Sequence, residues 1–153
     1  MKRKKCLAAL TAAGVISAMA LGMAVTSYAA DGWTKTNDHW TYINQGKTHT
    51  GWLQTSEGYY YMDLSTGYMT TGFKQIDGKW YFFRPGGLMA KGWINPEYGK
   101  WYYMLEDGTM VTGWLRIGDD YYFMRGDGSM GTGWREMDGA WYYFQENGKC
   151  VVN

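Results

Sequence analysis

Residues 113–134 read GWLRIGDDYYFMRGDGSMGTGW, and this stretch contains the features on which the fold depends. It begins and ends with the same Gly-Trp pair. A Gly-aromatic pair of this kind occurs six times, at Gly32-Trp33, Gly51-Trp52, Gly72-Phe73, Gly92-Trp93, Gly113-Trp114 and Gly133-Trp134. Successive pairs are 19, 21, 20, 21 and 20 residues apart. Such a period is typical of a chain that stacks one small unit many times.

A second aromatic cluster follows each pair after seven or eight residues. The clusters are Trp40-Thr41-Tyr42, Tyr60-Tyr61-Met62, Trp80-Tyr81-Phe82, Trp101-Tyr102-Tyr103, Tyr121-Tyr122-Phe123 and Trp141-Tyr142-Tyr143. Beyond the clusters a methionine recurs, at Met69, Met89, Met110 and Met130, and Cys150 occupies the same place in the last repeat. We interpret Cys150 as a small buried hydrophobic residue. The repeat thus carries aromatic rings at fixed positions, and what these rings bind is the question of function.

Each repeat is predicted to form a β-hairpin. The ring-bearing runs are only three to five residues long, and helical periodicity is absent. Turn dipeptides separate the runs, at Asp77-Gly78, Asp107-Gly108, Asp127-Gly128, Asp138-Gly139 and Asn147-Gly148. Such dipeptides favour a type I′ turn, in which both central residues have positive φ. A hairpin of about twenty residues cannot bury enough surface to be stable alone. We therefore expect an all-β protein, an elongated solenoid of stacked hairpins with an aromatic core.

The first 29 residues differ from the repeats and are predicted to be a secretory signal peptide. A basic start, Lys2 to Lys5, precedes an apolar run from Cys6 to Val25, and small residues follow at Ser27-Tyr28-Ala29. An uncleaved membrane anchor is the alternative, because the run is nearly long enough to span a bilayer. Residues 30–153 are then the repeat domain, with repeats starting near 32, 51, 72, 92, 113 and 133.

Charge argues against nucleic acid or anionic lipid as the main partner. The chain has 15 Lys and Arg against 14 Asp and Glu, and four basic residues lie in the signal segment. The mature part therefore carries 11 basic and 14 acidic residues, a net charge of −3. No integral membrane span is expected after cleavage.

The sequence does not predict an enzyme. Acidic pairs at Asp119-Asp120 and Glu106-Asp107 occupy turn positions that other repeats fill with Asp, Asn or Gly, so turn formation explains them. The only histidines, His39 and His49, have no Cys partner or HExxH motif, and we expect neither a metal site nor a cofactor. The repeats run from near residue 31 to the end, which leaves no room for a catalytic domain.

All six units resemble the choline-binding, or cell-wall-binding, repeats of secreted bacterial surface proteins. The resemblance is closest from Gly113-Trp114 to Phe144, with Asp127-Gly128-Ser129-Met130-Gly131-Thr132-Gly133-Trp134 inside that stretch. It implies a left-handed β-solenoid in which a choline is held between successive repeats. Each cage would use the aromatic residue of the Gly-aromatic pair and the first aromatic of the cluster, with the middle aromatic of the next cluster.

Carried over position by position, the resemblance implies five choline-binding cages. They are Trp33, Trp40 and Tyr61; Trp52, Tyr60 and Tyr81; Phe73, Trp80 and Tyr102; Trp93, Trp101 and Tyr122; and Trp114, Tyr121 and Tyr142. Trp134 and Trp141 have no following repeat and complete no cage. We expect the fourth cage to bind best and Phe73 to weaken the third, because Phe offers a poorer face to a cation than Trp.

The first functional hypothesis is a secreted, non-catalytic module that attaches to the choline residues of teichoic or lipoteichoic acids in a Gram-positive type of cell wall. A second is a glucan- or peptidoglycan-binding repeat protein, since ring-lined grooves also stack on sugars. A third is a structural spacer or adhesin in which the rings only pack. A homodimer that completes the last cage is a further possibility.

Overall fold

The computed structural model describes residues 30–151, so the expected signal peptide, residues 1–29, lies outside the described residues. Within this range the chain forms thirteen β-strands and no helix. The strands are β1 (Gly32–Thr36), β2 (His39–Asn44), β3 (Lys47–Thr48), β4 (Gly51–Gln54), β5 (Tyr59–Met62), β6 (Gly72–Ile76), β7 (Lys79–Phe83), β8 (Gly92–Glu97), β9 (Lys100–Met104), β10 (Gly113–Ile117), β11 (Asp120–Met124), β12 (Gly133–Met137) and β13 (Ala140–Phe144). The predicted all-β fold is confirmed. The described part of the chain holds no helix of the length and hydrophobicity that a bilayer crossing needs.

Each repeat is one antiparallel hairpin. Five of the sheets have two strands, and the first, β1-β2-β3, has a short third strand. In each hairpin from β4 onward the glycine of the Gly-aromatic pair lies opposite the last residue of the second strand, as Gly113 lies opposite Met124. The glycine that opens each hairpin from β4 onward has a φ of 70–81°, which a residue with a side chain rarely adopts. The recurrent glycine is therefore a backbone requirement.

The turn dipeptides are of two kinds, so the type I′ turn predicted for all five of them is wrong for three. At Asp77-Gly78 and Asp138-Gly139 both residues have positive φ, as the predicted type I′ turn requires. At Asp107-Gly108, Asp127-Gly128 and Asn147-Gly148 only the glycine does. There the glycine N–H donates to a carbonyl three residues earlier, as Gly128 donates to Arg125 at 2.8 Å. These dipeptides belong to longer loops that connect one hairpin to the next.

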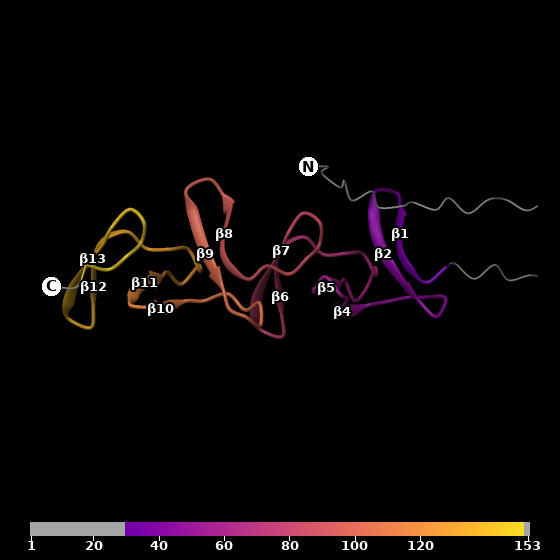
Figure 1. The fold of residues 1–153 in the computed structure, drawn as a ribbon, viewed down its shortest axis with the longest axis horizontal. Coiled ribbons are helices and arrows are strands. Elements are labelled where there is room, and N and C mark those ends of the chain that lie inside the picture. Colours follow the sequence, from indigo (N-terminus) through magenta and orange to yellow (C-terminus); the bar gives the residue numbers. More distant parts are fainter. Residues whose placement is uncertain (1–29, 152–153) are drawn as a thin grey trace, which may run out of the picture.

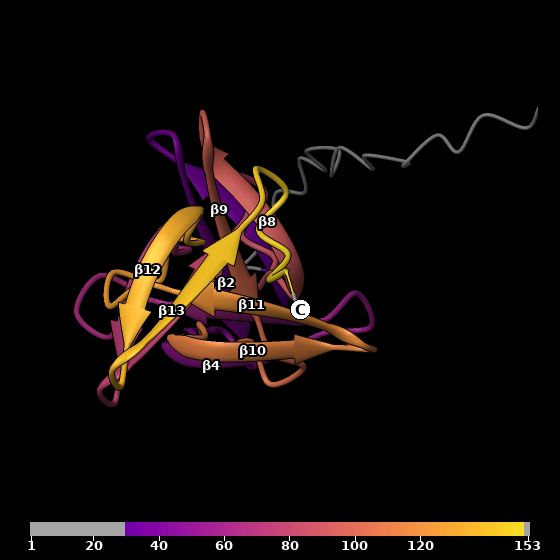
Figure 2. The same ribbon diagram turned by 90° about the vertical axis from the view of Figure 1, so that its left-hand side faces the viewer.

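The hairpins wind into an elongated solenoid, as predicted. Figure 1 shows them in sequence order along a rod, from β1 and β2 at one end to β12 and β13 at the other. Viewed along the rod, the hairpins lie on three sides of a triangle, with β4 behind β10 and β2 behind β8 and β9 (Figure 2). Three hairpins thus complete one turn of the solenoid.

One backbone hydrogen bond joins each repeat to the one before it. The N–H of Met110, after the fourth hairpin, donates to the carbonyl of Trp80 in the third at 2.8 Å. Equivalent bonds of 2.7–2.8 Å are Met69 to Trp40, Met89 to Tyr59, Met130 to Trp101 and Cys150 to Tyr121. Cys150 therefore takes the place of the recurrent methionine, and burial raises the pKa of its thiol.

The core follows the axis of the rod. The residue that ends the second strand of a hairpin is almost fully buried in Met62, Phe83, Met104, Met124 and Phe144. Around this line lie small clusters, such as Leu115 and Tyr122 with Met124, each shared by neighbouring repeats. Because the clusters are shared, a single hairpin would lose much of its buried surface without its neighbours.

The recurrent methionine also packs against the connecting loop of the following repeat. A β-carbon built on Gly128 would overlap the sulfur of Met110, and the same holds for Gly87 with Met69, Gly108 with Met89 and Gly148 with Met130. Thr48, which takes the methionine position in the first repeat, meets Gly67 in the same way. Each loop glycine therefore leaves the space that a methionine of the preceding repeat fills.

Replacing Gly128 with Ala is expected to lower the free energy of unfolding by about 2–4 kcal/mol, because backbone strain adds to overpacking. Gly139→Ala is the matched control. The two glycines have similar φ values, 81° and 78°, but a β-carbon at Gly139 would meet nothing within 4 Å. The control should cost only about 1–2 kcal/mol. Urea unfolding measures both values, and equal losses would refute the packing role.

Candidate functional site

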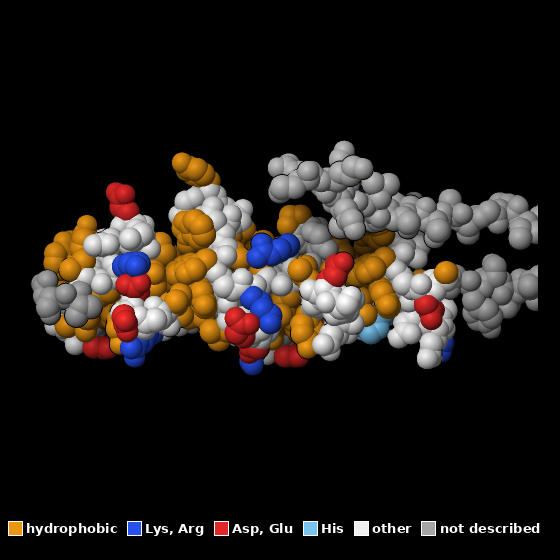
Figure 3. All heavy atoms as spheres, in the orientation of Figure 1, with side chains coloured by type: hydrophobic (Ala, Val, Ile, Leu, Met, Phe, Trp, Pro, Cys, Tyr) orange, Lys and Arg blue, Asp and Glu red, His pale blue; other side chains and the backbone are white. Residues whose placement is uncertain are grey.

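Four pockets with equivalent aromatic linings lie along the described part of the rod, each at the junction of successive repeats. In chain order their volumes are about 350, 490, 300 and 390 Å³. These volumes are at the small end of the range for small-molecule sites. Hydrophobic side chains reach the surface along the whole rod, with acidic and basic groups beside them (Figure 3). We refer to the pockets as first to fourth.

Each pocket is built from equivalent positions of its repeats. The first is lined by Trp33, Trp40, Tyr60, Met69, Pro85 and Gly86, and the second by Trp52, Tyr59, Tyr81, Met89, Lys91, Glu106 and Asp107. The third is lined by Phe73, Trp80, Glu97, Tyr102, Met110, Gly126 and Asp127, and the fourth by Trp93, Trp101, Tyr122, Met130, Glu146 and Asn147.

The fourth pocket shows the ring geometry most clearly. The rings of Trp93 and Trp101, from β8 and β9, have centroids 6.4 Å apart and planes at 82°. Tyr122, from β11 of the next hairpin, lies 5.0 Å from Trp93 and is 8% exposed. Trp101 is 45% exposed. Two indoles from one hairpin and a buried tyrosine from the next therefore form the walls of an open recess.

Alternation along the strands explains why these rings meet. Neighbouring side chains of a strand point to opposite faces of the hairpin. Trp101 and Tyr102 in β9 therefore contribute to different pockets, the fourth and the third. The aromatic clusters of the second, third and fourth repeats thus each contribute to two successive pockets.

The second repeat corrects the cages expected from the sequence. Tyr60, and not Tyr61, lies 4.9 Å from Trp33 in the first pocket. Tyr59, and not Tyr60, lies beside Trp52 in the second, with ring centroids 6.5 Å apart. Tyr61 is 6% exposed and packs in a buried cluster with Phe83 and Met89.

The reason for this correction is strand register. Trp52 pairs with Tyr61, just as Trp93 pairs with Tyr103 in the fourth hairpin. Tyr61 is therefore the third aromatic of its cluster, which begins at Tyr59. An error of one residue in the frame moves each side chain to the opposite face of the strand.

The third and fourth expected groups each line a single pocket, whereas in the fifth only Trp114 and Tyr142 are in ring contact. Phe73 and Tyr102 have ring centroids 4.9 Å apart, and both line the third pocket with Trp80. In the fifth group, Trp114 and Tyr142 are 5.0 Å apart. The guanidinium of Arg116 lies 5.5 Å from the centroid of the Tyr121 ring, so a cation of the protein already faces this ring.

Two kinds of pocket residue were not anticipated from the sequence. Each pocket is lined by one of the recurrent methionines, Met69, Met89, Met110 and Met130, for which the sequence predicts no role in binding. In addition, each pocket includes residues from the connecting loop of the repeat after next, such as Glu146 and Asn147 in the fourth. Every pocket is therefore built from three consecutive repeats.

The fifth group is consequently different from the four pockets. No loop of a later repeat covers it within residues 30–151. The last repeat has Trp134 67% exposed and Trp141 64% exposed, compared with 45% for Trp101. Within residues 30–151, no following hairpin supplies these two rings with the walls that the equivalent rings have elsewhere.

Carboxylates line three of the pockets. The Ser129 hydroxyl and backbone N–H donate to Asp127 at 2.6 and 2.9 Å, and these bonds lower the pKa of the Asp127 carboxyl. Thr109 bonds to Asp107 in the same way, with the same effect on its pKa. Both groups are therefore negatively charged at neutral pH. Open recesses of ring faces and carboxylates are suited to a small cation with an apolar surface.

Two descriptions of repeat families match the sequence. The description "Choline-binding repeat" matches residues 70–112 and 111–153, and "Putative cell wall binding repeat" matches residues 50–69. No protein with a curated description matches the chain significantly.

Solved structures from Streptococcus pneumoniae and its phage share the fold. CbpJ of S. pneumoniae TIGR4 is 34% identical over 80% of this chain and 46% of its own, with a TM-score of 0.77. Choline binding protein F of S. pneumoniae is 40% identical over 81% of this chain and 43% of its own, with a TM-score of 0.75. It has also been crystallised in the presence of a peptidoglycan analogue, a tetrasaccharide-pentapeptide.

A cell-wall endolysin is also similar. The multimodular pneumococcal endolysin from phage Cp-1, solved in complex with choline, is 31% identical over 81% of this chain and 38% of its own. The TM-score is 0.56. The present chain thus spans less than half the length of each of these three proteins.

The stability of the protein at low pH tests whether the ionised loop aspartates stabilise the fold. Because the folded-state pKa of Asp127 is lowered, its ionised form adds stability that is complete above the ordinary pKa near 4 and lost as the pH falls through the folded value. Asp127→Asn should reduce the loss of stability between pH 7 and pH 3, by at most about 1 kcal/mol because the group is exposed. Urea unfolding at the two pH values measures the difference.

The last repeat indicates that Asn is tolerated at the position of Asp127. Asn147 occupies the equivalent place and accepts a bond from the N–H of Lys149 at 3.0 Å. If Asp127→Asn and the unsubstituted protein lost equal stability on acidification, the proposed contribution of the carboxylate would be refuted.

Proposed function

The chain belongs to the family of choline-binding repeats, and on this premise we propose that it is a non-catalytic module that holds choline groups of a wall polymer. The observation that carries the proposal is the repeated pocket of rings from adjoining hairpins. In the fourth pocket, Trp93, Trp101 and Tyr122 form three walls around a space of about 390 Å³.

Ring faces are suited to a quaternary ammonium group. This group has no N–H to donate, so it gains little from the hydrogen-bond acceptors that hold a protonated amine. An aromatic face contributes about 0.5–2 kcal/mol, depending on how fully the cation loses its water. Three rings then supply a few kcal/mol, which corresponds to dissociation constants of roughly 1 mM.

The pockets are expected to differ in affinity. The first and fourth have two tryptophans each, and the fourth also has the carboxylate of Glu146. The second has one tryptophan and a tyrosine, Tyr59, in place of the other. In the third, Phe73 replaces the tryptophan of the Gly-aromatic pair and offers a weaker face to a cation.

A polymer that carries many choline groups would make weak sites effective. When several sites engage one polymer, the later binding events are intramolecular, and avidity can exceed single-site affinity by about 10² to 10⁴. Choline-substituted teichoic or lipoteichoic acid is such a polymer, and we propose it as the partner. The module would then act outside the cell, at the wall, after removal of residues 1–29.

The non-catalytic assignment rests on the content of the described residues. Their side chains make repeated pockets and turns, and Asp107 and Asp127 are held by bonds from Thr109 and Ser129. The endolysin from phage Cp-1 carries similar repeats as one part of a multimodular protein. The present repeats correspond to that part.

Peptidoglycan is the second candidate ligand. The observation in its favour is that choline binding protein F, which is 40% identical, was crystallised in the presence of a peptidoglycan analogue. Aromatic walls also stack on sugar rings, and open pockets such as the fourth leave room for a larger ligand.

Binding to a choline matrix tests the proposal directly. We expect the mature chain to be retained on immobilised choline and eluted by free choline. Trp93→Ala should weaken binding by about 1–3 kcal/mol at the fourth pocket, because it removes a cation-binding face. Calorimetric titration with choline measures the change.

Trp134→Ala is the matched control, since Trp134 belongs to the same position of a repeat but lines none of the four pockets. Equal losses for the two variants would contradict the assignment of the pocket. Elution by glycan oligomers but not by choline would favour the peptidoglycan ligand instead.

The fifth group should bind choline more weakly than the fourth pocket. It has Trp114 and Tyr142 at 5.0 Å but no covering loop within the described residues, and Arg116 places a positive charge at Tyr121. Trp114→Ala should therefore reduce the total heat of choline binding by less than Trp93→Ala. A larger effect of Trp114→Ala would show that the covering loop is dispensable.

A further inference from the structure

The third pocket differs from the others in the hairpin that forms its floor. In the fourth hairpin two residues, Asn95 and Pro96, lie opposite Trp101, where the other hairpins have one. This is a β-bulge, and proline is tolerated there because the bulged residue has no partner for an N–H. The Asn95 side chain donates to the carbonyl of Lys100 at 2.9 Å and holds the bulge in place.

The bulge brings Glu97 to a position that is apolar in neighbouring hairpins. Glu97 pairs with Lys100, as Ile76 pairs with Lys79 and Ile117 with Asp120. Ile76 is buried, and Ile117 packs against the cluster of Leu115 and Tyr122. Glu97, by contrast, is half-exposed and lines the third pocket.

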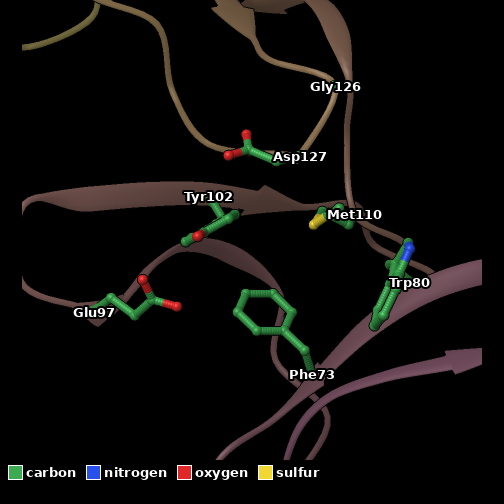
Figure 4. Close-up of a pocket in the computed structure, with 7 residues that line it drawn as sticks. All are labelled: Phe73, Trp80, Glu97, Tyr102, Met110, Gly126 and Asp127. Carbon is green, nitrogen blue, oxygen red and sulfur yellow. The ribbon is translucent and has the colours of Figure 1, made fainter.

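Figure 4 shows the position of the Glu97 carboxylate in this pocket. Trp80 stands at one end of the recess and Glu97 at the other, with Phe73 between them and Tyr102 above. Asp127 lies on the loop that covers the same recess. Burial raises the pKa of the Tyr102 hydroxyl, and the charges of Glu97 and Asp127 raise it further, against the opposite effect of Lys100.

The third pocket differs from the fourth at Phe73 and at Glu97, and these two differences have opposite effects on the attraction of a cation. Phe73 removes an indole face from the wall, and a phenyl face attracts a cation less strongly. Glu97 adds a negative charge on the opposite side of the recess. A carboxylate attracts any cation, whatever its shape, through an interaction that salt weakens.

We propose that Glu97 is a specificity-determining residue of the third pocket, where its negative charge adds to the attraction that the aromatic faces exert on a cation. This inference rests on the proposed binding of choline groups. Glu97→Gln should therefore reduce the discrimination of the third pocket between choline and the neutral alcohol in which a tert-butyl group replaces the trimethylammonium group. The two molecules have the same shape and differ in charge.

Substitution of Lys100 distinguishes a role of Glu97 in ligand binding from a purely structural role in the hairpin. Its ammonium lies 2.7 Å from Glu97, and both side chains are about half exposed. If the ion pair only stabilised the hairpin, Glu97→Gln and Lys100→Gln would have the same effect on the pocket. If Glu97 acts on the ligand, removal of Lys100 should strengthen cation binding, because it leaves the carboxylate less neutralised.

The test uses the indole N–H signals of the ¹⁵N-labelled mature chain. Among the pockets, Trp80 lines only the third, whereas Trp93 and Trp101 line only the fourth, so each pocket has its own reporter. Choline and its neutral analogue are titrated separately into the unsubstituted chain and both variants. Glu97→Gln should weaken choline binding at Trp80 by about two- to fivefold, and Lys100→Gln should strengthen it by a similar factor.

The fourth pocket and the neutral analogue are the internal controls. Affinities reported by Trp93 and Trp101, and those for the analogue at Trp80, should stay unchanged in both variants. Unchanged choline binding at Trp80 in Glu97→Gln, or weakening in both variants, would overturn the inference while choline binding at the fourth pocket upheld the proposed function. Absence of any response to choline at Trp93 and Trp101 in the unsubstituted chain would overturn both.

Discussion

The structure depends on the backbone hydrogen bond that each repeat makes to the one before it. The bond from Met110 to Trp80, repeated along the rod, fixes a methionine of one hairpin beside the first aromatic ring of the previous hairpin. The same methionine then fills the space above a loop glycine of the next repeat. One residue per repeat therefore determines how three successive hairpins fit together, and the pockets form at the places where they meet.

Stability and binding consequently share the same residues. Met110 helps to close the third pocket and also packs on Gly128. Tyr102 is buried in the core of the fourth hairpin and also lines the third pocket. A ligand that fills a pocket would contact three repeats at once, and so would stabilise the stacked arrangement in proportion to its affinity.

Much of the fold could be predicted from the sequence, because the period and the Gly-aromatic pairs act locally in each hairpin. The register of Tyr59-Tyr60-Tyr61 could not be predicted from these three residues alone, because they are identical. The equal spacing of Gly51 from Met62 and of Gly113 from Met124 identifies Tyr59 as the first aromatic of its cluster. The loop that covers each pocket depends on the winding of the solenoid, which no single repeat encodes. The position of Glu97 depends on the β-bulge at Asn95 and Pro96, where two residues lie opposite one.

The triangular winding has a consequence for the shape of any polymer that the rod can bind. Because three hairpins complete a turn, equivalent positions of neighbouring repeats face different sides of the rod, whereas those of the first and fourth repeats face the same side. We therefore expect the first and fourth pockets, which are built from equivalent positions, to open along the same side. A stiff, straight chain lying along that side could occupy only those two. Occupying all four requires a flexible chain that coils around the rod, or several separate chains approaching from different sides, in which case the module would act as a crosslink.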